Sequence, residues 1–121
     1  MNKPSRSILV FGIYLIANAL VLVATPNTLL GLLRLAPTTE PWIRVLGIVV
    51  GVLGGYYVSA ARQGLTGFFH ATVWGRGIAL VSLAVLVWLG LAPPILIGFG
   101  LVDAVGALWT WVALRSPIGA A

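Results

Sequence analysis

The chain contains no cysteine and very little charge. Without cysteine, disulfides, thiol catalysis and thiolate metal sites are all excluded. His70 is the single histidine, which excludes a haem held by two histidines of one chain. Charged residues make up only 7% of the 121 residues, too few to cover the surface of a soluble domain of this length. Most of the surface is therefore expected to face lipid.

Apolar residues are what the chain has in abundance. They make up 60% of the sequence, and the mean hydropathy is +1.11. A helix needs about 20 residues to cross a bilayer, so a chain of this length has room for four crossings. The seven lysines and arginines are scattered, with no basic run interleaved with aromatics. We expect them to anchor helix ends at the membrane edge rather than to bind nucleic acid.

Four apolar stretches predict transmembrane helices at about 7–25, 41–61, 68–91 and 95–114. Pro41 suits a first helical turn, and Pro93 and Pro94 end the third stretch. The leucines of segment 27–40 are too few to span, so we expect that segment to lie at the interface. The predicted fold is an all-α integral membrane four-helix bundle, one domain over 1–121, with a short interfacial segment between its first two helices.

The basic residues also predict an orientation. An even number of crossings puts both termini on one side, and more cations fall on that side than on the other. On the side of the termini are Lys3, Arg6, Arg62, Arg76 and Arg115, and on the other side are Arg34 and Arg44. By the positive-inside rule we expect cytoplasmic termini. Since the chain begins at Met1, we expect the first stretch to be a retained helix rather than a signal peptide cleaved after Ala24.

Small residues recur at the spacing that lets helix backbones approach closely in lipid. The candidate helix-packing positions are Gly47, Gly51 and Gly55 in the second helix, Ala71, Gly75 and Ala79 in the third, and Gly106 in the fourth. Packing within the four-helix bundle is favoured over a homodimer seam, because this pattern is common and carries little functional specificity.

Asp103 lies inside the fourth apolar stretch, about 12 Å from its outer end at 1.5 Å per residue. Arg76 lies at a similar distance from the opposite face. The difference in depth between Asp103 and Arg76 is therefore within the reach of an arginine side chain. We expect Asp103 to pair first with Arg76 and second with Arg44, with Asn18 as a further hydrogen-bonding residue. An unpaired charge at this depth costs at least about 2.5–3.5 kcal/mol. The cluster is either a structural lock or a site for a ligand head group or a proton, and the lock is slightly favoured.

The layout resembles the DoxX-like group of small bacterial four-helix membrane proteins. The resemblance rests on the interfacial segment, on the pattern Trp42-x-Arg44-x-x-Gly47, and on the glycines from Gly98 to Gly106 in the fourth helix. It implies membership of a membrane redox complex, as a subunit beside a quinone-reducing or quinone-oxidising enzyme. It supplies no catalytic residue to carry over.

These observations predict a non-catalytic protein of a bacterial inner membrane, with no cofactor and no metal. Its partners would be the lipid bilayer and either other membrane-protein chains or further copies of itself. We expect an accessory or structural subunit of a larger complex, electron transfer being one such role. The alternative is a small transporter, or a binder of lipid or quinone, that uses the polar site of Asp103 and Arg76. An enzyme acting alone is least favoured, because no nucleophile, base and orienting group fall together.

Overall fold

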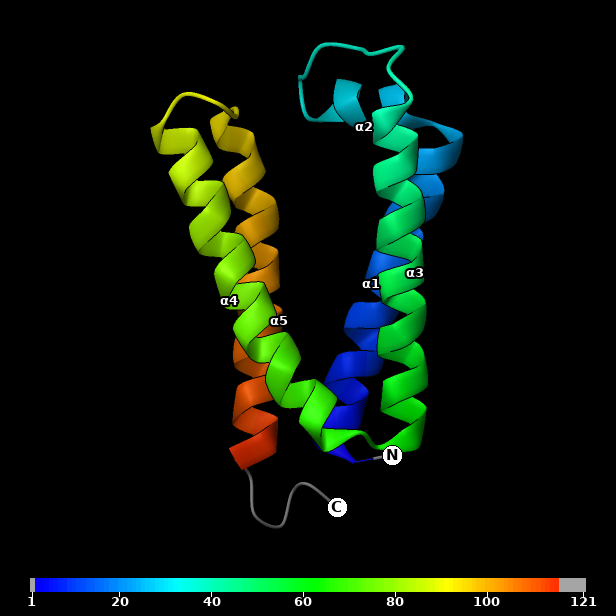
Figure 1. Ribbon diagram of the computed structural model, residues 1–121, viewed down its shortest axis with the longest axis vertical. Helices are drawn as coiled ribbons and strands as arrows, with labels where there is room; N and C mark the ends of the chain where they lie inside the picture. The colour runs from blue at the N-terminus through cyan, green and yellow to red at the C-terminus, as the bar shows by residue number, and fades with distance from the viewer. Residues whose placement is uncertain (1, 116–121) are drawn as a thin grey trace. The chain divides into compact units, whose positions relative to one another are not determined.

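A computed structural model describes residues 2–115, and within them the chain is helical and contains no β-strand (Figure 1). The helices are α1 (Lys3–Ala24), α2 (Pro26–Leu32), α3 (Trp42–Gln63), α4 (Thr66–Trp88), the short 3-10 helix η1 (Pro94–Leu96) and α5 (Ile97–Arg115). The prediction of an all-α fold is confirmed. By length and composition, α1, α3, α4 and η1 with α5 are each able to cross a membrane. The chain is thus a multi-pass membrane protein by its composition.

Helix ends follow local signals that the apolar pattern does not carry. The helix α1 begins at Lys3 because the side chain of Asn2 caps it, accepting a 2.9 Å hydrogen bond from the amide of Ser5. The helix α4 ends at Trp88, before the expected residue 91. Gly90 adopts φ +76, a left-handed conformation, and the amide of Leu91 closes the turn on the carbonyl of Leu86. This is the usual glycine-ended helix terminus.

The chain divides into two compact units. One consists of residues 9–59 and contains most of α1, all of α2 and most of α3. The other consists of residues 1–8 and 60–121 and contains the beginning of α1, the end of α3, and the hairpin of α4 and α5.

In the unit of residues 9–59, glycines bring α1 and α3 into close contact. A methyl group added to Gly54 would lie 2.8 Å from Ile16 and 2.9 Å from the carbonyl oxygen of Gly12. The same addition at Gly47 would lie 2.8 Å from Leu22. Two of the predicted packing glycines, Gly47 and Gly51, therefore face α1. The third, Gly55, faces open space, and its neighbour Gly54 occupies the seam.

The segment after α1 is tied together by side-chain to backbone hydrogen bonds. Asn27 in α2 donates from Nδ2 to the carbonyl of Thr38 at 3.1 Å and accepts from the amide of Thr38 at 2.8 Å. Arg34 stands just beyond α2 with φ 59, a conformation that glycine would adopt more easily. The predicted interfacial segment thus contains one short helix and a loop fastened back onto it.

In the other unit, α4 packs against α5. Gly100 is buried against α4, where an added methyl group would lie 2.8 Å from Leu80. Among the predicted small packing residues of α4, Ala71 is exposed, Gly75 has open space where a side chain would stand, and Ala79 is half-buried. The predicted stripe of α4 is therefore largely exposed in this unit, whereas the close approach of the hairpin is made at Gly100.

Candidate functional site

The polar centre of the unit that contains the α4–α5 hairpin is the side chain of Arg76, which is only 4% exposed although it lies well inside an apolar helix. Its Nε donates to the carbonyl of Thr72 at 3.2 Å, and its Nη2 donates to the hydroxyl of Thr72 at 2.9 Å. The same Nη2 donates to the hydroxyl of Thr110 on α5 at 3.0 Å. One guanidinium therefore joins α4 to α5.

A third helix is linked to the same group through Thr110. The hydroxyl oxygens of Thr110 and Ser7 are 2.8 Å apart, and both residues are almost fully buried. Ser7 Oγ also lies 2.8 Å from the carbonyl oxygen of Pro4, and Thr110 Oγ1 lies 3.1 Å from that of Gly106. Each hydroxyl has one proton to donate, so the network has a choice of donor direction between Ser7 and Thr110. We call Arg76, Thr72, Thr110 and Ser7 the hydroxyl network.

The direction of the arginine side chain follows from helix geometry. Side chains on an α-helix lean toward its N-terminus, so Arg76 reaches back over one turn to Thr72. Its charged end then lies nearer the beginning of α4 and the end of α5, where the polypeptide approaches the membrane surface. A buried guanidinium that turns toward the nearer interface lowers its own desolvation penalty.

Asp103 is half-buried on α5. It lies seven residues before Thr110, on the same face and about 10 Å along the axis. The charge of Arg76 acts on its carboxylate. Among the described residues, however, Asp103 makes no hydrogen bond or ion pair within contact distance. Arg76 and Asp103 therefore interact through their charges, while the hydrogen bonds of Arg76 go to hydroxyl groups nearer the N-terminus of α4, the end toward which helical side chains lean.

Arg44 and Asn18, the remaining predicted site residues, belong to the unit of residues 9–59. Arg44 is exposed, and its Nη1 donates to the backbone carbonyl of Val23 near the end of α1. Asn18 donates from Nδ2 to the carbonyl of Tyr14 one turn earlier, at 2.9 Å. Within that unit, both side chains donate hydrogen bonds to backbone carbonyls of α1, and they do not contact each other through these bonds.

Sequence reasoning singled out Arg76 but missed its hydroxyl partners. One signal was available, since Thr72 precedes Arg76 by four residues and so shares its helix face. Thr110 shares a face with Asp103 for the same kind of reason. The contact with Ser7 lies 103 residues away in sequence, and nothing in the spacing predicts it.

The arrangement holds a positive charge and distributes hydroxyl groups around it. Such a set of groups can fix the positions of helices, and it can also offer hydrogen bonds to an anion. No group of three or more His, Cys, Asp or Glu side chains within residues 2–115 is arranged to hold a metal ion.

Comparison with known proteins gives no relative. No protein-family model, no curated protein and no solved structure matches the chain.

Proposed function

We propose that the chain is a small non-catalytic protein of a bacterial inner membrane, where it serves as an accessory or structural subunit of a larger membrane complex. The observation that carries this proposal is the binding of Arg76 by hydroxyl groups of its own chain. A charge held in this way fixes the position of α4 against α5. That is a structural task and requires no ligand.

An exposed face of α3 supports docking to another membrane chain. Ile48 and Val52 are both about half exposed, and Gly55 follows them on the same face with open space where a side chain would stand. Apolar side chains gain little from contact with each other in lipid, so close backbone approach at small residues is what favours helix association. Gly55 gives α3 such a position on a surface that its own unit leaves uncovered.

The layout that resembles the DoxX-like proteins supports an electron-transfer complex as the kind of assembly. The excess of cations on the side of the termini supports a cytoplasmic location for both ends.

Co-purification tests the proposal. The chain is tagged, extracted gently from its native membrane and analysed by mass spectrometry together with every polypeptide that remains bound. We expect larger chains in a fixed ratio, and we expect Gly55→Leu to lower that ratio several-fold. The matched control is Gly98→Leu on α5, where an added side chain also meets open space. Absence of any bound chain from the wild-type preparation would refute the proposal.

A second candidate function rests on Asp103. Its carboxylate is half-buried in an apolar helix and has no hydrogen-bonding partner among the described residues, and intramembrane acids are functional candidates by default. A small transporter or a binder of lipid or quinone would use Asp103 with Arg76. In that case Asp103→Asn abolishes binding or flux while the amount of folded protein in the membrane is unchanged. Loss of the folded protein would favour a structural role instead.

A further inference from the structure

A long groove runs along the outside of the α4–α5 hairpin. It has a volume of about 750 Å³. Its lining includes His70, Trp74, Gly77, Ser82, Ala104 and Trp111. All of these residues belong to the unit that contains the hairpin. The groove is separate from the hydroxyl network, because Arg76 directs its guanidinium to Thr72 and Thr110 rather than to this surface.

The groove has the length of one lipid tail. From His70 to Ser82 it follows α4 for twelve residues, which is about 18 Å at 1.5 Å per residue. The hydrocarbon core of a bilayer is about 30 Å thick, so one leaflet contributes about 15 Å. Small residues, Gly77 on α4 and Ala104 on α5, form part of its floor. An acyl chain from a single leaflet fits such a channel.

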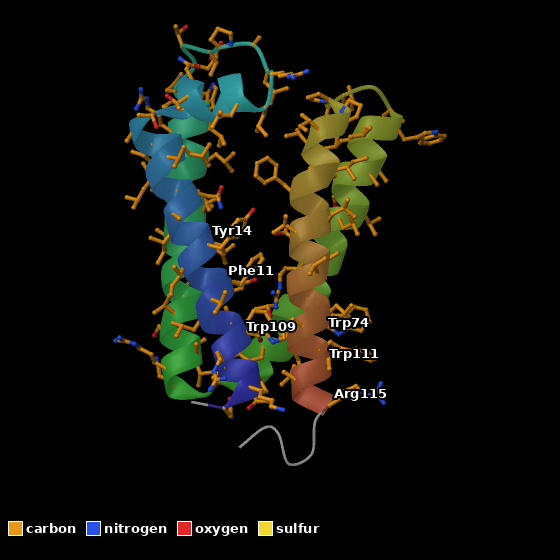
Figure 2. The ribbon with its side chains drawn as sticks, turned by 180° about the vertical axis from the view of Figure 1, so that it is seen from behind. Phe11, Tyr14, Trp74, Trp109, Trp111 and Arg115 are labelled. Atoms are coloured by element: carbon orange, nitrogen blue, oxygen red, sulfur yellow. The ribbon has the colours of Figure 1, made fainter. Side chains whose placement is uncertain are left out.

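One end of the groove is basic and aromatic. Arg115 stands over the ring of Trp111, with its Cζ 4.7 Å from the ring centroid. Figure 2 shows Trp74, Trp111 and Arg115 on the same side of the hairpin, whereas Trp109 lies on another side of α5. His70 lines the groove near this end, about 6 Å along α4 from Thr66. The cation and the aromatic rings therefore stand near the level of lipid head groups.

We infer that this groove, which we call the α4–α5 lipid groove, binds one anionic glycerophospholipid. One of its two acyl chains lies between the two helices, and its phosphate faces Arg115, Trp111 and His70. The charge of the surroundings favours an anionic head group over a zwitterionic one, since Lys3 and Arg6 belong to the same unit and to the same membrane side by the expected topology. Basic pockets between transmembrane helices on the cytoplasmic side are known to suit such head groups. The inference is independent of the proposed subunit role.

Native mass spectrometry of the purified full-length chain tests this inference. The protein in detergent is titrated with phosphatidylglycerol and, separately, with phosphatidylcholine of the same acyl chains. We expect one phosphatidylglycerol per chain, bound at least about fivefold more tightly than phosphatidylcholine, the factor that corresponds to about 1 kcal/mol for one cation near the surface. Equal binding of the two lipids would overturn the inference.

Two pairs of variants localise the site. Arg115→Gln is expected to lower the preference for phosphatidylglycerol about fivefold, whereas Arg62→Gln, an exposed cation outside the groove, is expected to preserve it. Gly77→Leu fills the groove, and Gly75→Leu places the same side chain elsewhere on α4. Neither glycine has an atom within 4 Å of the position of an added Cβ, so both variants are expected to fold.

The second pair separates lipid from protein as the occupant. Loss of phosphatidylglycerol binding in Gly77→Leu but not in Gly75→Leu supports the groove as the lipid site. Equal effects of the two variants, or equal effects of Arg115→Gln and Arg62→Gln, would show only diffuse attraction and would overturn it. A change from dimer to monomer in Gly77→Leu, with lipid binding unchanged, would assign the groove to a second copy of the chain and would also overturn it.

Discussion

Arg76 on α4 and Thr110 on α5 are joined by a 3.0 Å hydrogen bond, and both side chains are almost completely buried. The bond lies in an apolar hairpin, where a polar group without a partner is strongly disfavoured. Thr110 also contacts Ser7 of α1, so one hydroxyl lies between a charge and a third helix. The stability of this unit should therefore respond to changes at these few atoms.

Thr110→Val is expected to destabilise the protein by about 1–3 kcal/mol, because it removes the acceptor for Arg76 and the partner of Ser7 while keeping the shape of the side chain. Unfolding of the purified protein in mixed micelles, followed by circular dichroism, measures the change. Thr28→Val on the exposed surface of α2 is the control and should be within about 0.5 kcal/mol of wild type. Equal stability of Thr110→Val and wild type would contradict the structural role of the network.

Of two replacements of Arg76, the uncharged one should leave the protein more stable than the charged one. Arg76→Met removes the buried charge, and the hydroxyls of Thr72 and Thr110 keep acceptors in the carbonyls of Phe69 and Gly106. This variant should be close to wild type in stability, as apolar replacements of satisfied buried charges often are. Arg76→Lys retains a charge but has one nitrogen in place of the two that act here, Nε toward the carbonyl of Thr72 and Nη2 toward the hydroxyls of Thr72 and Thr110, and it should be less stable than Arg76→Met.

The unfolding assay used for Thr110→Val also compares the stabilities of Arg76→Met and Arg76→Lys. If Arg76→Lys were the more stable of the two, charge rather than geometry would be what the site requires. A functional assay then separates the roles, because a structural lock tolerates Arg76→Met in the assembled complex and a ligand site does not.

The seam of α1 and α3 offers a matched pair of neighbouring glycines. Gly54→Ala places a methyl group 2.8 Å from Ile16 and 2.9 Å from the backbone carbonyl of Gly12, so it should destabilise the protein by about 1–3 kcal/mol. Gly55→Ala meets nothing within 4 Å and should be neutral or slightly stabilising, since alanine is the better helix former. Thermal unfolding in detergent compares them. Equal losses in the two variants would contradict the close seam.

The sequence was sufficient for the helices but only partly for the contacts between them. Hydropathy and prolines locate the long helices to within a few residues, because helices in lipid must be continuous and about 20 residues long. The exact glycines in contact depend on rotation about the helix axis. Spacing predicts Gly47, Gly51 and Gly55 as a stripe. The glycines that contact α1 are Gly47, Gly51 and Gly54, and Gly55 is not among them.

Only part of the polar cluster could be predicted from the sequence. Burial of Arg76 follows from its place in an apolar helix, and so does its need for compensation. Equal depth predicts Asp103 as a partner, and the charge of Arg76 does act on Asp103, but depth alone does not give the hydrogen-bonding partners, because it ignores the lean of helical side chains toward the N-terminus. That lean brings Arg76 to Thr72 and Thr110. Hydroxyl partners on distant segments leave no periodic signal, and only coordinates reveal them.

The orientation in the membrane can be tested directly because the chain has no cysteine of its own. Thr39→Cys places a thiol in the exposed loop between α2 and α3, and Thr66→Cys places one at the exposed beginning of α4. If the termini are cytoplasmic, an impermeant maleimide should label Thr39→Cys in cells whose outer membrane has been made permeable and whose inner membrane is intact. It should label Thr66→Cys only after the inner membrane is permeabilised. The reverse pattern would place the basic end of the α4–α5 lipid groove outside, where the positive-inside rule no longer supports it.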